Sequence, residues 1–248
     1  GGHEGLADHI SALLDATKQV VVATGIVSVW THPAEEIAAE HDSIRKAHPD
    51  RFLLGLGVSH ASVVERAGLQ YRRPLQKMVS YLDQLDAANP PVPKQERVLA
   101  ALGPRMLELS RNRSWGAHPY FVTPEHTRRA REALGDGALL APEQMAVLET
   151  DPDKARAVAR QSIGMYLAAP NYTSNLLRLG FTQADFADGG SDRLVDAIVA
   201  WGDASKILSR VNEHHDAGAD HVCIQILSSD RQALPRAAWR ELARAFKG

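Results

Sequence analysis

Solid apolar runs alternate along the chain with amphipathic stretches, and this alternation predicts parallel strands separated by helices. A strand that is buried on both faces reads as a continuous apolar run, because neither of its faces meets water. The runs are Val20–Ala23, Phe52–Gly57, Val98–Leu102, Ala117–Val122, Ala138–Leu140 and Val222–Leu227. They predict six strands of an α/β fold.

Between these runs, apolar residues recur three and four positions apart, which predicts helices that bury one face. Leu75, Met78, Val79, Leu82 and Leu85 form one such stripe behind Pro74, a residue suited to the first turn of a helix. Further stripes lie within residues 6–14, 155–166 and 239–246. Residues 151–180 and 191–217 predict additional helices, so we expect a helical insertion over about 151–217, before the last strand.

The strand count bears on the architecture. A (β/α)8 barrel needs eight strands, whereas six parallel strands could instead form a doubly wound open sheet. Periodicity alone leaves both architectures open. The proline-rich stretch Asn89–Pro93 is a short rigid connection, not a domain linker, so we predict a single domain over residues 1–248.

Composition narrows the function classes. The 248 residues carry 28 Lys+Arg and 30 Asp+Glu without a block of like charge, which removes the electrostatic argument for nucleic acid or anionic membranes. No apolar run approaches ~20 residues, so we expect no membrane span and a cytoplasmic protein. One cysteine, Cys223, excludes an intrachain disulfide and a Cys-based zinc site. The histidines also predict no metal site, because His214 and His215 are neighbours that point in different directions on a helix.

The first candidate for chemistry is the stretch from Gly55 to His60. It begins like the dinucleotide fingerprint G-x-G-x-x-G, but His60 replaces the last glycine and no helix start is evident after it. The same stretch is one residue away from the hydrolase pattern G-x-S-x-G, which would make Ser59 a nucleophile. His221 would have to complete that triad from a strand start, where no triad histidine is expected. The dinucleotide-binding and hydrolase alternatives both stay open at this point. A third possibility is that the glycines only allow the backbone at the strand end to approach another group closely.

The second candidate is the end of the run at Val98–Leu102. Pro104 can begin a helix there, and Leu102 and Gly103 would then offer backbone amides to a phosphate at the helix N-terminus. His60, His118 and Glu143 each fall just after a predicted strand, a position where reacting groups gather in parallel α/β folds. We therefore treat these three side chains as candidate catalytic residues.

Two long stretches, Val22–Trp30 and Arg51–His60, resemble the third and fourth strands of the luciferase-like monooxygenase superfamily. Ala100–Pro104, Gly116–Tyr120, Thr123–His126 and Ala217–Val222 continue the match in the family's order. They are similar to the subgroup that uses the deazaflavin coenzyme F420. The resemblance covers essentially the whole chain.

The resemblance implies a (β/α)8 barrel with the coenzyme across its C-terminal mouth. In the family a non-prolyl cis peptide supports the flat ring, backbone groups of two loops hold the phosphate, and further residues line the ring pocket. The matching positions are Gly25 and Ile26 for the cis peptide, Val58, Ser59, Leu102 and Gly103 for the phosphate, and Ser28 and Trp30 for the pocket.

The chain departs from the family pattern at two places. His60 stands where some members place a catalytic glutamate, so we expect an imidazole to act as acid, base or anion stabiliser. His118 and Glu143 become candidates for the substrate side. The family's first strand, first helix and second strand have no match, so we expect the N-terminal βαβ portion to be absent from this sequence. We also expect a partner subunit, a helix or further strands to cover the edges at residues 20–29 and 222–227.

The sequence therefore predicts an oxidoreductase that transfers a hydride between F420 and a small organic substrate, as a homodimer. One alternative is FMN-dependent monooxygenation in the same barrel. Another is a non-catalytic relative that binds flavin or serves as a dimer partner.

Overall fold

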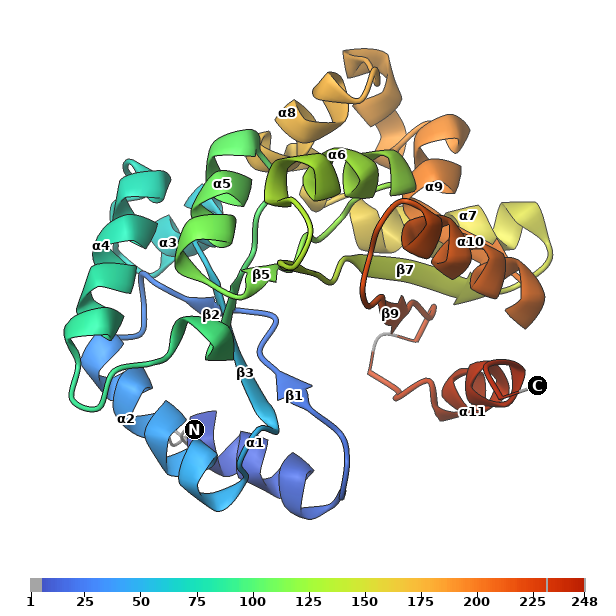
Figure 1. The fold of residues 1–248 in the computed structure, drawn as a ribbon. Helices are drawn as coiled ribbons and strands as arrows, with labels where there is room; N and C mark the ends of the chain where they lie inside the picture. Colours follow the sequence, from blue (N-terminus) through green and yellow to red (C-terminus); the bar gives the residue numbers. More distant parts are fainter. Residues whose placement is uncertain (1–5, 231, 248) are drawn as a thin grey trace. The chain divides into compact units, whose positions relative to one another are not determined.

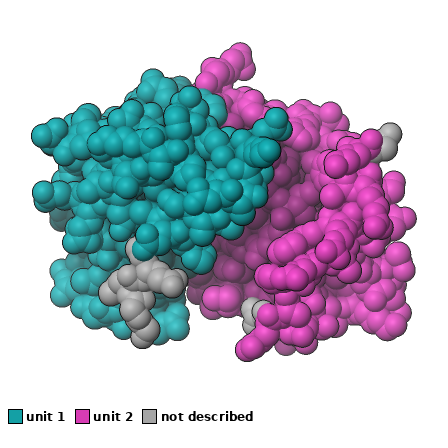
Figure 2. Space-filling view, turned by 90° about the horizontal axis from the view of Figure 1, so that it is seen from below, with its two compact units in different colours: residues 1–118 teal, residues 119–248 magenta. Residues whose placement is uncertain are grey.

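The computed structural model describes residues 6–230 and 232–247. Its residues fall into two compact units, 1–118 and 119–248 (Figure 2). Helices and strands alternate in both units (Figure 1). None of the described helices is long and apolar enough to cross a membrane.

The strands of the first unit are all parallel. β3 lies between β4 on one side and the short strands β1 and β2 on the other, and β5 pairs with β4. The elements are α1 (Leu6–Asp15), β1 (Val22–Ala23), β2 (Val27–Ser28), α2 (Ala34–Ala47), β3 (Phe52–Gly57), α3 (Ala61–Arg66), α4 (Pro74–Ala87), η1 (Lys94–Glu96), β4 (Arg97–Leu99), α5 (Pro104–Arg113) and β5 (Gly116–Ala117).

The core of the first unit lies between this sheet and helices α1, α2 and α4. All six residues of β3 are buried, as its unbroken apolar run predicts. Helix α4 begins with Pro74 in its first turn and buries Met78, Leu82 and Leu85, which confirms the predicted helix and its apolar face. In α1 the predicted stripe holds only in part, because Leu13 is half exposed.

The predicted strand at residues 20–29 is split into β1 and β2. Thr24 lies at the break, where its hydroxyl donates to the carbonyl oxygen of Gly55 at 2.9 Å and accepts from the Gly55 N–H at 2.8 Å. One side chain thus satisfies both backbone groups of Gly55 that a regular ladder would have paired. A Cβ at Gly55 would lie 1.8 Å from the carbonyl oxygen of Thr24, so this close approach requires glycine.

The second unit has its own parallel strands, with β7 between β8 and β9. Its elements are α6 (Pro124–Leu134), β6 (Leu139–Leu140), β7 (Glu143–Leu148), α7 (Pro152–Ile163), η2 (Tyr166–Ala168), α8 (Pro170–Arg178), η3 (Gln183–Gly189), α9 (Asp192–Ile198), β8 (Val199–Gly202), α10 (Ala204–Asp216), β9 (Cys223–Ile226) and α11 (Arg236–Ala245).

Two predictions for this unit were wrong. β8 lies inside the region 151–217 that was predicted to be wholly helical. Helix α9 passes into β8 without an intervening turn, so the apolar stripe of the helix continues directly into the strand. The predicted strand at 138–140 is present as β6, but the next strand, β7, was not predicted, because Glu143 and Gln144 are polar although both are buried. In addition, Trp239 and Phe246 of α11 are about half exposed, and of the predicted stripe there only Leu242 is buried.

A buried chain of hydrogen bonds joins β7 to α10 and α6. The Gln144 amide nitrogen donates to the carbonyl oxygens of Met145 and Ile198, which leaves its oxygen to accept from His214 Nε2 at 2.9 Å. His214 Nδ1 then accepts from the Thr127 hydroxyl at 2.8 Å. The chain needs a neutral imidazole, and burial lowers the pKa of His214 to about 3. His214 is therefore a structural residue.

β1 is an edge strand in the first unit, and β8 and β9 are edge strands in the second, as far as the described strands show. The expectation that other residues cover the edges of β1 and β9 stays a prediction.

Candidate functional site

The carboxyl ends of β2, β3 and β4 lie together at one edge of the first unit's sheet. The register pairs Leu56 with both Val27 and Leu99, and the Ala100 N–H donates to the Leu56 carbonyl oxygen at 2.8 Å. The loops that leave these strands are consequently neighbours. In parallel α/β folds this edge is where ligands bind.

The loop after β3 carries Val58, Ser59 and His60. Ser59 has a left-handed φ of 54°, and His60 precedes the first turn of α3, where its carbonyl oxygen accepts from the N–H groups of Val63 and Val64. A helix therefore does begin directly after His60, contrary to the sequence-based expectation. Val58, Ser59 and His60 are all half-buried, so the loop is open to a ligand on one side.

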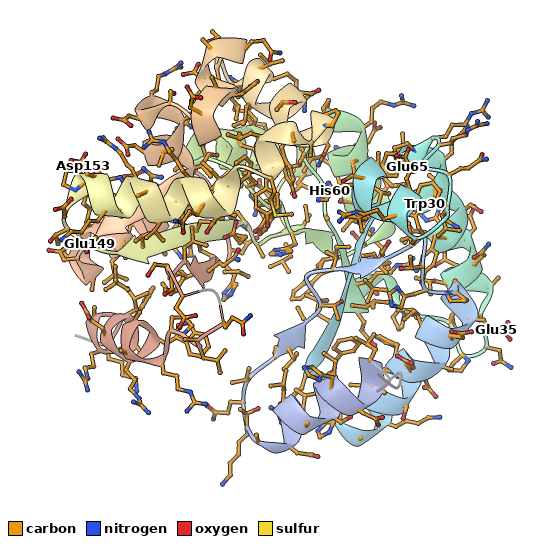
Figure 3. The ribbon with its side chains drawn as sticks, turned by 180° about the vertical axis from the view of Figure 1, so that it is seen from behind. Trp30, Glu35, His60, Glu65, Glu149 and Asp153 are labelled. Carbon is orange, nitrogen blue, oxygen red and sulfur yellow. The ribbon has the colours of Figure 1, made fainter. Side chains whose placement is uncertain are left out.

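Trp30 ties the residues after β2 to this loop. Its indole N–H donates to the carbonyl oxygen of Val58 at 2.8 Å, and its ring lies 5.4 Å from the ring of Tyr71. Lys77 Nζ lies 5.6 Å from the centre of the indole ring. Trp30 and His60 are both seen at this end of the first unit in Figure 3. Tyr71 was not singled out from the sequence, because no motif surrounds it.

Gly25, Ile26 and His118 lie beside the same strand ends. The Gly25–Ile26 peptide bond is cis, as the resemblance implied. Gly57 leaves room for Ile26, since a Cβ there would lie 2.6 Å from Ile26 Cγ1. A Cβ at Gly25 would lie 3.5 Å from His118 Nε2, and the His118 N–H donates to the Leu99 carbonyl oxygen at 2.9 Å. These contacts bring the three residues together.

Leu102 and Gly103 lie at the start of α5. Gly103 accepts from the N–H groups of Met106 and Leu107, and Pro104 occupies the first helical position. The first N–H groups of a helix have no acceptor within the helix, and together they carry a partial positive charge. This donor set fits a phosphate, as expected from the sequence.

A groove of about 410 Å³ opens beside the start of α5. It is lined by Arg73, Pro74, Leu75, Gln76 and Arg105. These residues come from the first turns of α4 and α5, so two helix N-termini and two guanidinium groups face it without a carboxylate in the lining. The groove therefore favours an anion.

Glu143 belongs to the second unit, where it follows the end of β6 and is the first residue of β7. Its side chain is 5% exposed, and neither carboxyl oxygen makes a well-formed hydrogen bond to a described residue. Burial raises the pKa of Glu143 to about 8, an effect that the backbone N–H of Phe121 opposes only in part. The carboxyl is consequently a neutral acid at pH 7.

Aromatic side chains that sequence reasoning missed pack beside Glu143. The Tyr120 hydroxyl lies 2.9 Å from the Tyr166 hydroxyl and 3.0 Å from Gln225 Oε1. Since an amide oxygen only accepts, Tyr120 donates to Gln225 and accepts from Tyr166. The rings of Tyr166 and Tyr172 meet edge to face at 5.4 Å. The members of this cluster lie far apart in the sequence, so no local spacing could reveal it.

The chain was compared with known proteins. The family model for luciferase-like monooxygenases matches residues 9–221. No curated protein matches the chain by sequence.

Solved structures with the same fold include two that depend on F420. An F420-dependent secondary alcohol dehydrogenase, in complex with an F420–acetone adduct, has a TM-score of 0.68 and 17% identity over 91% of this chain and 79% of its own. The coenzyme F420-dependent tetrahydromethanopterin reductase from Methanopyrus kandleri has a TM-score of 0.73 and 15% identity over 97% and 87%.

A third similar structure contains FMN. It is the oxygenating constituent of 3,6-diketocamphane monooxygenase from Pseudomonas putida, with a TM-score of 0.66 and 11% identity over 96% of this chain and 81% of its own. At these identities the likeness establishes the fold. The chain has the α/β fold of the TIM-barrel type, as the resemblance implied, and not that of a doubly wound sheet.

Proposed function

Because the chain belongs to the luciferase-like monooxygenase family, we propose that it is an oxidoreductase which transfers a hydride between a bound deazaflavin coenzyme and a small organic substrate. The observation that carries this proposal is the meeting of the loops after β2, β3 and β4 at one sheet edge, beside the N-terminus of α5. The two similar structures that depend on F420 add support for a deazaflavin.

The residues at this edge fit such a coenzyme. Leu102 and Gly103, with Val58 and Ser59, offer a phosphate the start of a helix and a tight loop. The other binding positions are Gly25, Ile26, Ser28 and Trp30, which would contact the ring system. All of these residues are half-buried except Gly25, which is exposed, so a ligand can reach them. When bound, the coenzyme accepts or supplies the hydride, and the protein contributes orientation and charge.

His60 is our candidate for proton handling. Its imidazole is half-buried and stands at the mouth of the loop that we assign to the phosphate, where a ring nitrogen can give a proton to, or take one from, a substrate oxygen. His118, next to Gly25, is a second candidate on the substrate side. Glu143 is a third, and its protonated carboxyl could supply a proton at neutral pH.

FMN-dependent monooxygenation is the second candidate function. It is favoured by the family's name and by the similar FMN-containing structure. The N–H groups at the start of α5 could donate hydrogen bonds to the phosphate of either coenzyme. The finer expectations of a homodimer and of a cytoplasmic location also remain proposals.

Titration of the purified protein with F420 and, separately, with FMN tests the proposal. We expect saturable binding of F420, detected by its absorbance and fluorescence, and weaker binding of FMN. Preferential binding of FMN would replace the proposal with the monooxygenase alternative. Failure to bind either coenzyme would overturn both and favour a non-catalytic relative. Trp115→Phe, a change at an exposed side chain, serves as the control for handling effects on fluorescence.

A further inference from the structure

The carboxyl of Glu143 is buried near the backbone N–H of Phe121 and makes no well-formed hydrogen bond to a described residue. No described lysine, arginine or histidine forms an ion pair with it, and both of its oxygens are inaccessible to water. An ionised carboxylate without water or a cation is costly, and buried polar groups are nearly always hydrogen-bonded. The position therefore suits the neutral acid, and an ionised Glu143 would have to gain water or a ligand.

The groups that face Glu143 supply no positive charge. Cys223 is its partner in the register of β9, Tyr120 lies in the segment before α6, and Tyr172 comes from α8. Burial raises the pKa of Cys223 to about 11 and raises the pKa of both tyrosines, and the charge of Glu143 adds to each rise. These groups are consequently neutral at pH 8.

Charged groups on the other elements around β7 are engaged elsewhere. Arg156 and Arg160 of α7 form ion pairs with Asp192 and Asp196. His214 of α10 is neutral and bonds to Gln144. Because neighbours along a strand point to opposite faces, Gln144 takes this histidine away from Glu143.

Residues 166–178, named the cover segment here, carry two of the tyrosines beside Glu143. The segment consists of η2 and α8, and its Tyr172 contacts the rings of Tyr120 and Phe121. Gly164 precedes the segment and Gly180, with a φ of 88°, follows it. Met165 and Leu177 are exposed, and a polar tie to α6 runs from Arg129 to the carbonyl oxygen of Arg178 at 2.9 Å. The buried side chains of α8 are Tyr172, Asn175 and Leu176, and Tyr166 of η2 is hydrogen-bonded to Tyr120.

We propose that the cover segment closes over Glu143 while this carboxyl carries its proton, and opens when the carboxyl loses that proton to water. The open form presents the carboxylate together with the Tyr120 hydroxyl and the Gln225 amide. These groups suit a small molecule that donates hydrogen bonds or carries a positive charge. The inference goes beyond the proposed function, in which Glu143 is only a third candidate for proton transfer, and its test involves the second unit alone and no coenzyme.

The direction of the pH effect follows from linkage. The carboxyl has a pKa of about 8 in the closed form and its ordinary value of 4.5 once exposed to water. A group whose pKa is higher in the closed form stabilises that form fully at low pH. The opening constant should therefore rise by up to about tenfold per pH unit between these two values, and level off above pH 8.

Hydrogen exchange measured by mass spectrometry at pH 6, 7 and 8 tests the proposal. After division by the intrinsic exchange rates, we expect the opening constant of residues 166–178 in the wild type to rise about tenfold from pH 6 to 7 and about fivefold from pH 7 to 8. The Glu143→Gln variant should give a flat profile, because an amide does not titrate. Helix α10 serves as the internal reference. Glu149→Gln, at the other end of β7, is the matched control and should behave as the wild type (Figure 3).

A flat profile in the wild type would overturn the proposal, and so would an unchanged rise in Glu143→Gln. If the glutamine variant fails to fold, Glu143→Leu replaces it, since leucine fills the site without titrating. A rise that persists in the leucine variant would equally overturn the proposal. Coenzyme titration of the same samples tests the proposed function separately.

Discussion

The indole N–H of Trp30 donates to the carbonyl oxygen of Val58 over 2.8 Å, which fixes the residues after β2 to the loop after β3. The bond holds Val58 in place from outside its own loop. Trp30 therefore shapes the site that we assign to the coenzyme in two ways, through its ring surface and through its side-chain hydrogen bond to the backbone of Val58.

Replacing Trp30 with phenylalanine should weaken coenzyme binding. The variant keeps an aromatic ring against Tyr71 but loses the donor to Val58, a change worth about 1 kcal/mol, or roughly a fivefold rise in Kd. Fluorescence titration with F420 measures it. Trp115→Phe should bind as the wild type does, and equal loss in both variants would contradict the assignment.

His60→Ala should reduce turnover far more than coenzyme affinity. If the imidazole transfers a proton, we expect a loss of ~10²-fold or more in the hydride-transfer rate, with the Kd changed only slightly. Stopped-flow absorbance of the coenzyme gives the rate once a substrate is found. His9→Ala, on the exposed face of α1, is the control. Unchanged turnover in His60→Ala would make His60 a pocket-lining residue only.

The two ends of the Arg97–Asp86 ion pair should differ in their contribution to stability. Arg97 is 2% exposed and donates to Asp86 at 2.6 Å and to the carbonyl oxygen of Arg113 at 3.0 Å. Asp86→Ala leaves a buried guanidinium unpaired and should cost about 3–5 kcal/mol. Arg97→Met removes the buried charge itself, and Arg113 still pairs with Asp86, so we expect a smaller loss of about 2–3 kcal/mol.

Urea unfolding of both variants measures this difference. Asp83→Ala removes a more exposed pair with Arg113 and should cost less than about 1 kcal/mol. The reverse order of the two main variants would show that Arg97 is stabilised by something other than Asp86.

Acid should destabilise the protein partly through His214. Its pKa is lower in the folded chain, about 3, than the ordinary 6.5, so its contribution is present above 6.5 and is lost as the pH falls toward 3. We expect the free energy of unfolding to fall by about 1.4 kcal/mol per pH unit from this histidine alone. His41, whose pKa burial lowers to about 4, adds to the slope.

Urea unfolding at pH 7, 6 and 5 measures how much of the pH dependence of the free energy of unfolding comes from His214. His214→Asn should show a shallower slope than the wild type, although its stability at pH 7 is lower. His9→Asn should keep the full slope. Identical slopes in all three proteins would assign the acid sensitivity to other groups.

The sequence predicted the elements whose apolar pattern is uninterrupted. β3 and α4 lie where their runs and stripes indicated. β8 could not be separated from α9, because Ile198 and Val199 adjoin and belong equally to either pattern. β7 was not predicted, because Glu143 and Gln144 at its start are polar and their burial depends on partners from other elements.

In the candidate site, too, contacts that follow from the apolar pattern could be predicted, whereas contacts that depend on the folded chain could not. Loop residues such as Ser59 and Gly103 lie next to strand ends that periodicity locates, so their meeting could be expected. The contact between Trp30 and Val58 depends on the rotamer of one indole and leaves no trace in spacing. The tyrosines at 120, 166 and 172 come together only through the path of the chain between them.

The close contact between Gly55 and Thr24 affects how substitutions at position 55, natural or engineered, should be interpreted. A side chain at that position would collide with the Thr24 carbonyl oxygen, so selection should reject every substitution there, whatever molecule the protein binds. A mutational scan would then rank Gly55 among the least tolerant positions of the strand that leads to His60. Such intolerance, seen next to a binding loop, would report the geometry of one backbone crossing and not recognition of a ligand.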